Sequence, residues 1–205
     1  MNVFKREVNS SCLEFLSMEM VDVVMNLTGS TDNDFTLAAE VLDEIGFIVG
    51  QKLMERYCKD TECVRFEEQV SSASYCKELE IVKFLCKDFW QLLFKKPVNG
   101  LRTNTGPNPK YKYVLQDHNF PWLKRLSTDS PEQAKKLADR YLCYPRGIIR
   151  GALHNLGLET KVSSSVALNG PAFACSFTIL TKAHLQAMGE SGIPTPSPRA
   201  SGSGN

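Results

Sequence analysis

The chain has 205 residues, of which 42% are hydrophobic, and its 24 lysines and arginines nearly balance 23 acidic residues. A chain of this length can bury one good core, so we expect a single domain. The near-neutral charge provides no overall field that would favour nucleic acid or an acidic membrane as the main partner.

The seven cysteines are an odd number, and no CxxC pair stands at the histidine spacing of a zinc site. This usage predicts a reducing compartment and no metal site. Phosphate-loop and dinucleotide glycine patterns are also absent, so no cofactor is expected. The N-terminus MNVFKREVNSS lacks the apolar core of a signal peptide, and no apolar run approaches the roughly 20 residues that span a bilayer. We therefore expect a soluble, intracellular protein.

A first helix is predicted over residues 12–27, CLEFLSMEMVDVVMNL, where Glu14, Glu19 and Asp22 are the only charges. A surface helix normally carries an apolar stripe about 100° wide. A helix that is apolar most of the way round must be covered on two sides, so one core cannot account for all of its apolar surface.

A second helix is predicted from Phe35 to Cys58, with Gly46 and Gly50 four residues apart on one face. Each glycine costs about 1 kcal/mol relative to alanine in a helix interior, so a compensating contact is expected. We interpret the pair as a tight helix crossing. A phosphate-binding role is excluded because no strand precedes the glycines.

A third helix is predicted over residues 77–96, where the polar positions form one narrow stripe and the others are apolar. The polar positions are Glu80, Lys83, Lys87 and Gln91. Cys86 lies on the apolar side, where burial would raise its pKa and leave the thiol inert. Asp88 is two residues away and faces another direction. No histidine is placed beside a nucleophile, so we expect no catalytic residue and no cysteine-dependent hydrolase.

The remaining elements are two hairpins with a helix between them. The segments VNGLRTN and YKYVLQD predict the first hairpin, and KVSSSVAL and AFACSFTIL predict the second. A helix is predicted over residues 130–155, and Pro145 should break or kink it into two parts. The expected order is three helices, a hairpin, a broken helix and a hairpin.

Residues 1–182 are expected to form the domain, and residues 183–205 a tail that becomes rich in glycine, serine and proline. Such composition predicts disorder. The basic residues are scattered, and phosphate-loop patterns are absent, so nucleic-acid binding is not expected. The excess of apolar helix surface instead predicts a protein partner that covers the first two helices.

Four segments together resemble a known family: IVKFLCKDFWQLLFKK, LRTN, YVLQDHNFPWL and YPRGIIRGALHNLGL. They look like the small subunits of the TRAPP vesicle-tethering complex, in the branch called subunit 33 in yeast and subunit 6 in animals. The resemblance covers about residues 8–181. It implies an α/β fold in which α-helices pack on one side of a four-stranded antiparallel twisted sheet, in agreement with the predicted order of elements.

The resemblance also implies a function. Members of this branch are non-catalytic scaffold subunits of a complex that exchanges guanine nucleotide on a Rab-type GTPase and tethers vesicles in ER-to-Golgi and Golgi traffic. The protein would be cytoplasmic and peripheral at those membranes. Its partners would be the acyl-binding sister subunit, as a heterodimer formed through the first two helices, further TRAPP subunits and, indirectly, the GTPase. The implied interface residues are Leu13, Leu16, Met20, Val24, Leu27, Gly46 and Gly50.

Cys63 resembles the position at which the acyl-binding sister subunit carries its lipidated cysteine. Two interpretations stay open for this thiol: an acyl attachment site, or an exposed cysteine in a loop. The first would make the chain a hydrophobic-ligand (acyl chain) binding module of the same fold, which is the alternative to a scaffold.

Overall fold

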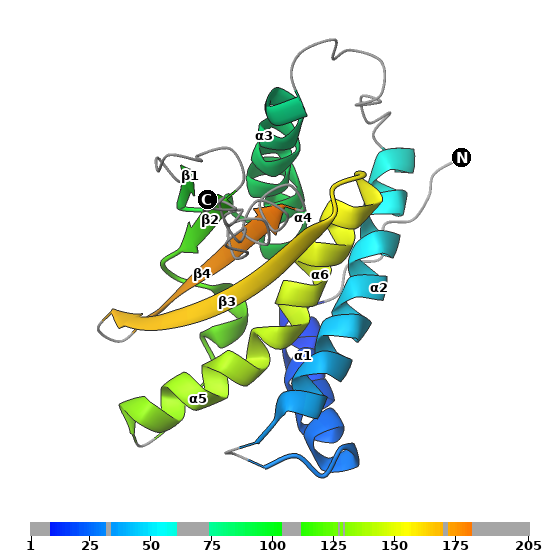
Figure 1. The fold of residues 1–205 in the computed structure, drawn as a ribbon. Helices are drawn as coiled ribbons and strands as arrows, with labels where there is room; N and C mark the ends of the chain where they lie inside the picture. Colours follow the sequence, from blue (N-terminus) through cyan, green and yellow to red (C-terminus); the bar gives the residue numbers. More distant parts are fainter. Residues whose placement is uncertain are drawn as a thin grey trace, which may run out of the picture.

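The computed structural model describes residues 9–31, 34–60, 74–103, 112–126, 128, 130–169 and 172–181 (Figure 1). The elements in chain order are α1 (Ser10–Leu27), α2 (Thr36–Asp60), α3 (Ser74–Phe84), the π-helical turn η1 (Leu85–Phe89), α4 (Trp90–Phe94), β1 (Gly100–Thr103), β2 (Lys112–Asp117), the 3-10 turn η3 (Pro121–Leu123), α5 (Pro131–Tyr141), α6 (Cys143–Asn155), β3 (Thr160–Asn169) and β4 (Ala172–Thr181). Among the described helices, none combines the length and the apolar character that crossing a bilayer requires.

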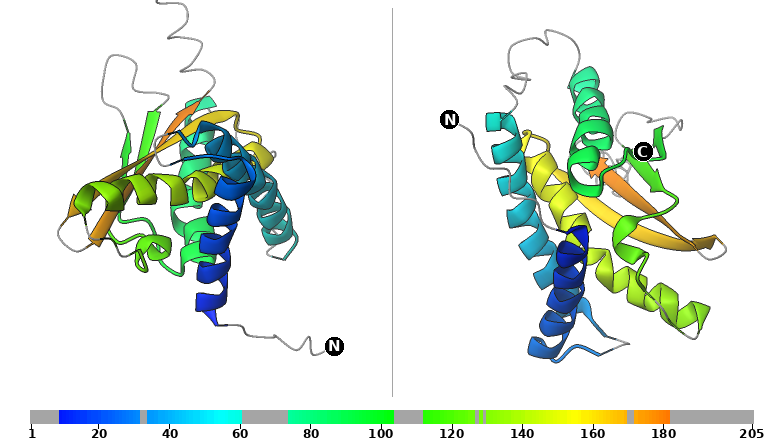
Figure 2. Two further views of the ribbon diagram at one scale, coloured as in Figure 1. Left: turned by 90° about the horizontal axis from the view of Figure 1, so that it is seen from below. Right: turned by 180° about the vertical axis from the view of Figure 1, so that it is seen from behind.

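The four strands form one antiparallel sheet in the order β1-β2-β4-β3. Tyr113 and Leu115 of β2 lie opposite Ile179 and Phe177 of β4, and all four side chains are fully buried. Alternate residues of a strand point to opposite faces, so one face of the sheet meets the core and the other meets solvent. Figure 2, seen from below, shows the sheet on one side of helices α1 and α2. The predicted one-sided helix-on-sheet fold is confirmed.

Helices α2 and α6 pack side by side along most of their length (Figure 1). The contact is made by Gly46 and Gly50 of α2 and by Gly147 and Gly151 of α6, where an added Cβ would lie 2.0 to 2.2 Å from a backbone oxygen of the facing helix. Only glycine permits two helix backbones to approach this closely. The tight helix crossing predicted from the glycine spacing is therefore present, and α6 is its second member.

The helix predicted over residues 130–155 is two helices that meet at Leu142 and not at Pro145. Pro145 lies in the first turn of α6, where its missing N–H would have had no partner within the helix. A proline ring clashes with the carbonyl group four residues earlier, which here belongs to Tyr141. The break consequently falls at Leu142, directly after the last residue of α5 and three residues before the proline.

The third predicted helix also differs from a regular α-helix, because residues 85–89 form a π-helical turn. The backbone carbonyl of Cys86, within this turn, accepts a hydrogen bond of 3.1 Å from the backbone N–H of Val98. The helix ends at Lys95, whose backbone is left-handed with φ 59°. This geometry turns the chain back toward the sheet and leaves Lys95 exposed at the end of α4.

A buried carboxylate fixes α4 to the sheet. Asp117, at the end of β2, is 1% exposed and accepts a hydrogen bond of 3.1 Å from Trp90 Nε1. Its other oxygen forms an ion pair with Lys96 and accepts the backbone N–H of Asn119 at 3.0 Å. Each oxygen of this desolvated carboxylate thus has a partner, as a buried charge requires. The last turn of α4 is thereby held in a defined position.

Candidate partner interface

Helix α1 presents one continuous apolar stripe to solvent. The residues Leu13, Leu16, Met20, Val23 and Leu27 follow each other at spacings of three and four, which puts them on one face. Leu16 is 66% exposed and Leu27 is 82% exposed, whereas Met20 is half-buried against the core. The apolar excess predicted for this helix therefore lies partly outside the core of the chain.

Three of the residues expected at the partner interface are instead covered by the chain itself. Val24 is 7% exposed and belongs to the hydrophobic core. Gly46 and Gly50 face the backbone of α6 and are buried. The expectation that these three residues contact a partner is wrong, because the close approach that glycines permit is already used inside the domain.

The exposed apolar side chains of α2 lie on its other side. Leu37 is 55% exposed, Val41 36% and Ile48 53%. Leu37 stands nine residues before Gly46, which at 3.6 residues per turn places it about 180° away. These residues were missed by the sequence analysis, although the same rotation applied to the glycine face would have found them.

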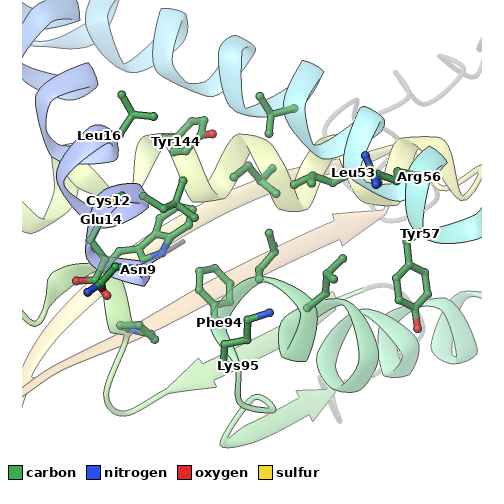
Figure 3. Close-up of a pocket in the computed structure, with 17 residues that line it drawn as sticks. Asn9, Cys12, Glu14, Leu16, Leu53, Arg56, Tyr57, Phe94, Lys95 and Tyr144 are labelled. Carbon is green, nitrogen blue, oxygen red and sulfur yellow. The ribbon is translucent and has the colours of Figure 1, made fainter. Parts of the chain in front are cut away.

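A groove opens where α1, α2, α4, η3 and α6 meet, and its volume is about 1040 Å³ (Figure 3). Leu13 and Leu16 form its wall on α1, Leu53 on α2 and Leu92 on α4. Leu13 is 48% exposed and Leu92 37%, so the walls are open to solvent rather than closed over the space. The groove is therefore continuous with the apolar stripe of α1.

The floor of the groove is aromatic. Trp122 of η3 stacks on Tyr144 of α6 with ring centroids 5.7 Å apart and an angle of 14° between the planes. Phe94 of α4 meets Trp122 edge-on at 5.2 Å and packs on the buried Trp90 at 4.7 Å. Burial raises the pKa of Tyr144 above its ordinary value. Because these rings pack against one another and against the core, the floor is already formed in the isolated chain.

Three charged residues line the groove: Glu14, Arg56 and Lys95. The carboxylate of Glu14 is held by Arg125, which also donates a hydrogen bond of 2.8 Å to Ser11 Oγ. Arg56 and Lys95 are the cationic residues of the lining. Glu14 is thus paired within the chain, and Lys95 is an exposed cation beside the groove.

A second charge cluster stands beside the glycine crossing and has a structural role. Asp43 of α2 pairs with Arg146 and Arg150 of α6, each at 2.7 Å. The guanidinium of Arg150 also lies 4.2 Å from the centroid of the Phe47 ring. These contacts fix the two helices relative to each other, and they occupy both arginines.

The cysteines of the described core have no features of a nucleophile. Burial raises the pKa of Cys86 to about 12, as expected for its apolar side of the helix, and it raises the pKa of Cys143. Within the parts of the chain that the structure describes, no group of three or more metal-ligating side chains is found. Cys63 lies outside the described residues.

We expect Cys86 and Cys175 to resist alkylation, because burial raises both pKa values to about 12 and the thiolate is the reactive form. The exposed Cys12 should react readily. Brief treatment of the native protein with N-ethylmaleimide, followed by peptide mass spectrometry, measures each site. Labelling of Cys86 as fast as Cys12 would contradict this assignment, and labelling of all three in denaturant is the positive control.

The fold and this surface define a class: an α/β domain whose described surface includes an exposed apolar stripe on α1. A family model described as transport protein particle (TRAPP) component matches residues 13–182, and the chain belongs to this family of trafficking-complex components. The predicted resemblance is thus confirmed.

Several relatives are similar over most of the chain. Trafficking protein particle complex subunit 6b of Danio rerio is 35% identical over 173 residues, which cover 84% of this chain and 96% of the relative. Subunit 6B of Homo sapiens is 41% identical over 139 residues, covering 68% of this chain and 75% of the relative. Subunit 6A of Homo sapiens is 40% identical over 131 residues, covering 64% and 72%. The similarity to the animal subunit 6 branch is confirmed.

A solved structure shares the fold. It is trafficking protein particle complex subunit 3 from Naegleria fowleri, covalently bound to palmitic acid. The TM-score is 0.57 at 15% sequence identity, over 85% of this chain and 97% of that chain. The likeness concerns the arrangement of helices and strands.

Proposed function

We propose that this chain is a non-catalytic scaffold subunit of a TRAPP-type vesicle-tethering complex, and that it acts by pairing with a sister subunit. The observation that carries the proposal is the exposed apolar stripe of α1, in which Leu16 is 66% and Leu27 82% exposed. Contiguous apolar surface on a protein in water marks an interaction site. The exposed leucine, valine and isoleucine of α2 would extend the same interface.

The proposed partner is the acyl-binding sister subunit, of the subunit 3 type, in a heterodimer. Family membership and the similarity to subunits 6A and 6B support assembly with other TRAPP subunits. The heterodimer would join the complex that exchanges nucleotide on a Rab-type GTPase, with exchange carried by other subunits. In this role the chain is cytoplasmic and peripheral at Golgi and ER-to-Golgi membranes.

The proposal is tested by expressing the chain with and without a subunit 3 protein and measuring the mass of each species by size-exclusion chromatography with light scattering. We expect a stable one-to-one complex, and self-association or precipitation of the chain alone. A well-behaved monomer that forms no complex would overturn the proposal, because the apolar stripe of α1 would then remain exposed to water without a partner to cover it.

A second candidate function is the binding of an acyl chain, and the groove of about 1040 Å³ is the observation that favours it. Apolar pockets of several hundred Å³ are typical of hydrophobic-ligand sites. Attachment would transfer the acyl group from an acyl-thioester donor to the sulfur of Cys63, which forms a new thioester and releases the thiol of the donor. The intact mass of the natively expressed protein, before and after hydroxylamine, measures a thioester-linked acyl chain, and organic extraction with mass spectrometry measures an unattached one.

A further inference from the structure

The outer face of the sheet, opposite the core, is positively charged. Among the described strand residues, those that point outward include three cations and no acidic side chain. We infer that this face binds an extended acidic segment of a partner protein at a basic cluster formed by Arg102, Lys112 and Lys161. The inference goes beyond the proposed pairing, because the cluster lies on the sheet, whereas the pairing would use α1 and α2.

The register of the strands places Lys112 and Lys161 on the outer face. Tyr113 is fully buried on the core side of β2, so the adjacent Lys112 points outward. Lys112 and Lys161 both lie directly opposite Leu180 of the inner strand β4. Residues directly opposite each other in an antiparallel sheet share a face. The two lysines therefore flank one leucine across three adjacent strands.

Arg102 completes the cluster from strand β1. It lies opposite Val114, which comes two residues after Lys112 on β2 and therefore on the same face. Two strand spacings put Lys112 and Lys161 about 10 Å apart, and diagonal neighbours such as Arg102 and Lys112 are about 7 Å apart. These distances are close to the Debye length of about 8 Å at physiological salt. The cations therefore repel one another, and an anionic ligand would relieve the repulsion.

No acidic side chain of the strands neutralises the basic cluster. Asp117 is the only acidic residue of the four strands, and it is buried on the core side, where it pairs with Lys96. Glu159 stands two residues before Lys161, but no ion pair joins them. Within the described residues, none of the three cluster cations takes part in an ion pair. Their charge is available to a partner.

Protection of the sheet edges explains only part of the basic cluster. Charged side chains on edge strands prevent two sheets from pairing at their edges. That role can account for Arg102 on β1 and for Lys161 on β3, which are the two edge strands. It does not account for Lys112, because β2 is an inner strand. The position of Lys112 therefore favours a ligand of opposite charge.

The composition of the outer face argues against nucleic acid and against a lipid bilayer. The aromatic residues of the strands, Tyr113, Phe173 and Phe177, occupy core-side positions, so no ring is offered for base stacking. Basic segments that bind anionic lipids gather about four to eight cations, and the described strands present three. An acidic polypeptide is the ligand class that fits the face best.

An extended acidic segment matches the spacing of the basic cluster. Alternate side chains of an extended chain point the same way and lie about 7 Å apart, close to the separation of Arg102 and Lys112. Leu180 lies between the cations and is half-buried, which offers an apolar contact between two ion pairs. Ser163 and Thr178 lie opposite each other beside the cluster, where their hydroxyl groups can bond to a peptide backbone. Acidic residues at alternate positions would thus meet several of these groups together.

The test measures binding of a fluorescein-labelled peptide of alternating glutamate and serine by fluorescence anisotropy at low ionic strength. A peptide of about ten residues spans about 33 Å when extended, which is enough to cross the four strands. The protein is the full chain, in complex with a subunit 3 protein if that complex forms, and alone if it does not. The cluster variant combines Arg102→Gln, Lys112→Gln and Lys161→Gln.

The control variant loses the same net charge at three exposed lysines outside the sheet. It combines Lys87→Gln, Lys124→Gln and Lys135→Gln. Single exposed ion pairs are weak, so we expect the loss of all three cluster cations to weaken peptide binding about tenfold. The control variant should bind as the wild type does, high salt should weaken the wild-type interaction, and a peptide with glutamine in place of glutamate should not bind.

Equal binding of the glutamate peptide by the cluster variant and the control variant would overturn the inference, as would no binding by the wild type. Phosphatidylserine vesicles and a single-stranded uridine oligonucleotide are measured in parallel. Binding of either that depends on the cluster, without binding of the peptide, would assign the face to lipid or to nucleic acid and would also overturn the inference.

Folding and pairing are measured separately from peptide binding. Circular dichroism checks that both triple variants fold, and Lys112→Gln with its control Lys87→Gln replaces them if the cluster variant does not. Light scattering with a subunit 3 protein reports the pairing, which the cluster variant should retain. Loss of peptide binding with normal pairing would support the inference, and failure of the wild type to pair would refute the proposed pairing while the peptide measurement on the chain alone still decides the inference.

Discussion

Replacing Gly151 with alanine is expected to lower the free energy of unfolding by about 3 kcal/mol or more, which places it among the most damaging single changes available in this fold. The added Cβ would lie 2.0 Å from the carbonyl oxygen of Phe47 and 2.8 Å from its carbonyl carbon. These are backbone atoms of α2, so no side-chain rotation can relieve the clash. Helices α2 and α6 must move apart, and the packing between them is lost. Urea unfolding followed by circular dichroism measures the change.

Gly100→Ala is the matched control for Gly151→Ala. A Cβ at Gly100 would meet nothing nearer than 3.8 Å, and that atom belongs to the flexible side chain of Gln116. We expect its free energy of unfolding to stay within about 0.5 kcal/mol of the wild type. Equal stability of the two variants would show that the crossing of α2 and α6 is looser than described.

The architecture was predictable because the spacing of polar and apolar residues along each element indicates which side of it meets solvent. In the third predicted helix, the polar stripe of Glu80, Lys83, Lys87 and Gln91 is exposed along its length, as the spacing of three and four indicated. In β4, Cys175, Phe177 and Ile179 are buried on one face, as their alternation indicated. The period of the apolar pattern indicates whether a segment is a helix or a strand, and it indicates which side faces the core.

What could not be predicted is which neighbour covers a given apolar face. The spacing of Gly46 and Gly50 indicates a close helix neighbour, but spacing is the same whether that neighbour belongs to the chain or to a partner. The answer lies about 100 residues further on, where Gly147 and Gly151 have the same spacing. Val24 was misassigned for the same reason, since both sides of α1 are apolar.

Local irregularities were the other limit. The π-helical turn at residues 85–89 was not predicted, because the spacings of three and four along the polar stripe were assigned to a regular α-helix. The break at Leu142 would have followed from the clash between Pro145 and the carbonyl group of residue 141, had the position of that group been considered. Cys63 and the predicted tail over residues 183–205 lie outside the described residues, so both stay predictions.

Changing Leu16 to glutamate is expected to abolish pairing with the sister subunit while leaving the domain folded. Leu16 is 66% exposed in the isolated chain, and glutamate is about as good a helix former as leucine, so the stability should change by less than about 0.5 kcal/mol. In the complex the same position would place an unpaired carboxylate in an apolar interface, where desolvation is costly. We expect the affinity to fall about a hundredfold or more.

The control for Leu16→Glu is Ala167→Glu, which introduces the same charge at an exposed position of β3 in the sheet. Thermal unfolding and size-exclusion chromatography with light scattering are measured for both variants, with and without a subunit 3 protein. Both should fold, but only Ala167→Glu should form the complex, and Leu16→Glu alone should be more soluble than the wild type because its apolar stripe is interrupted. Normal complex formation by Leu16→Glu would show that the interface does not include this face of α1. A folded Leu16→Glu variant that fails to pair would show that the interface lies on α1.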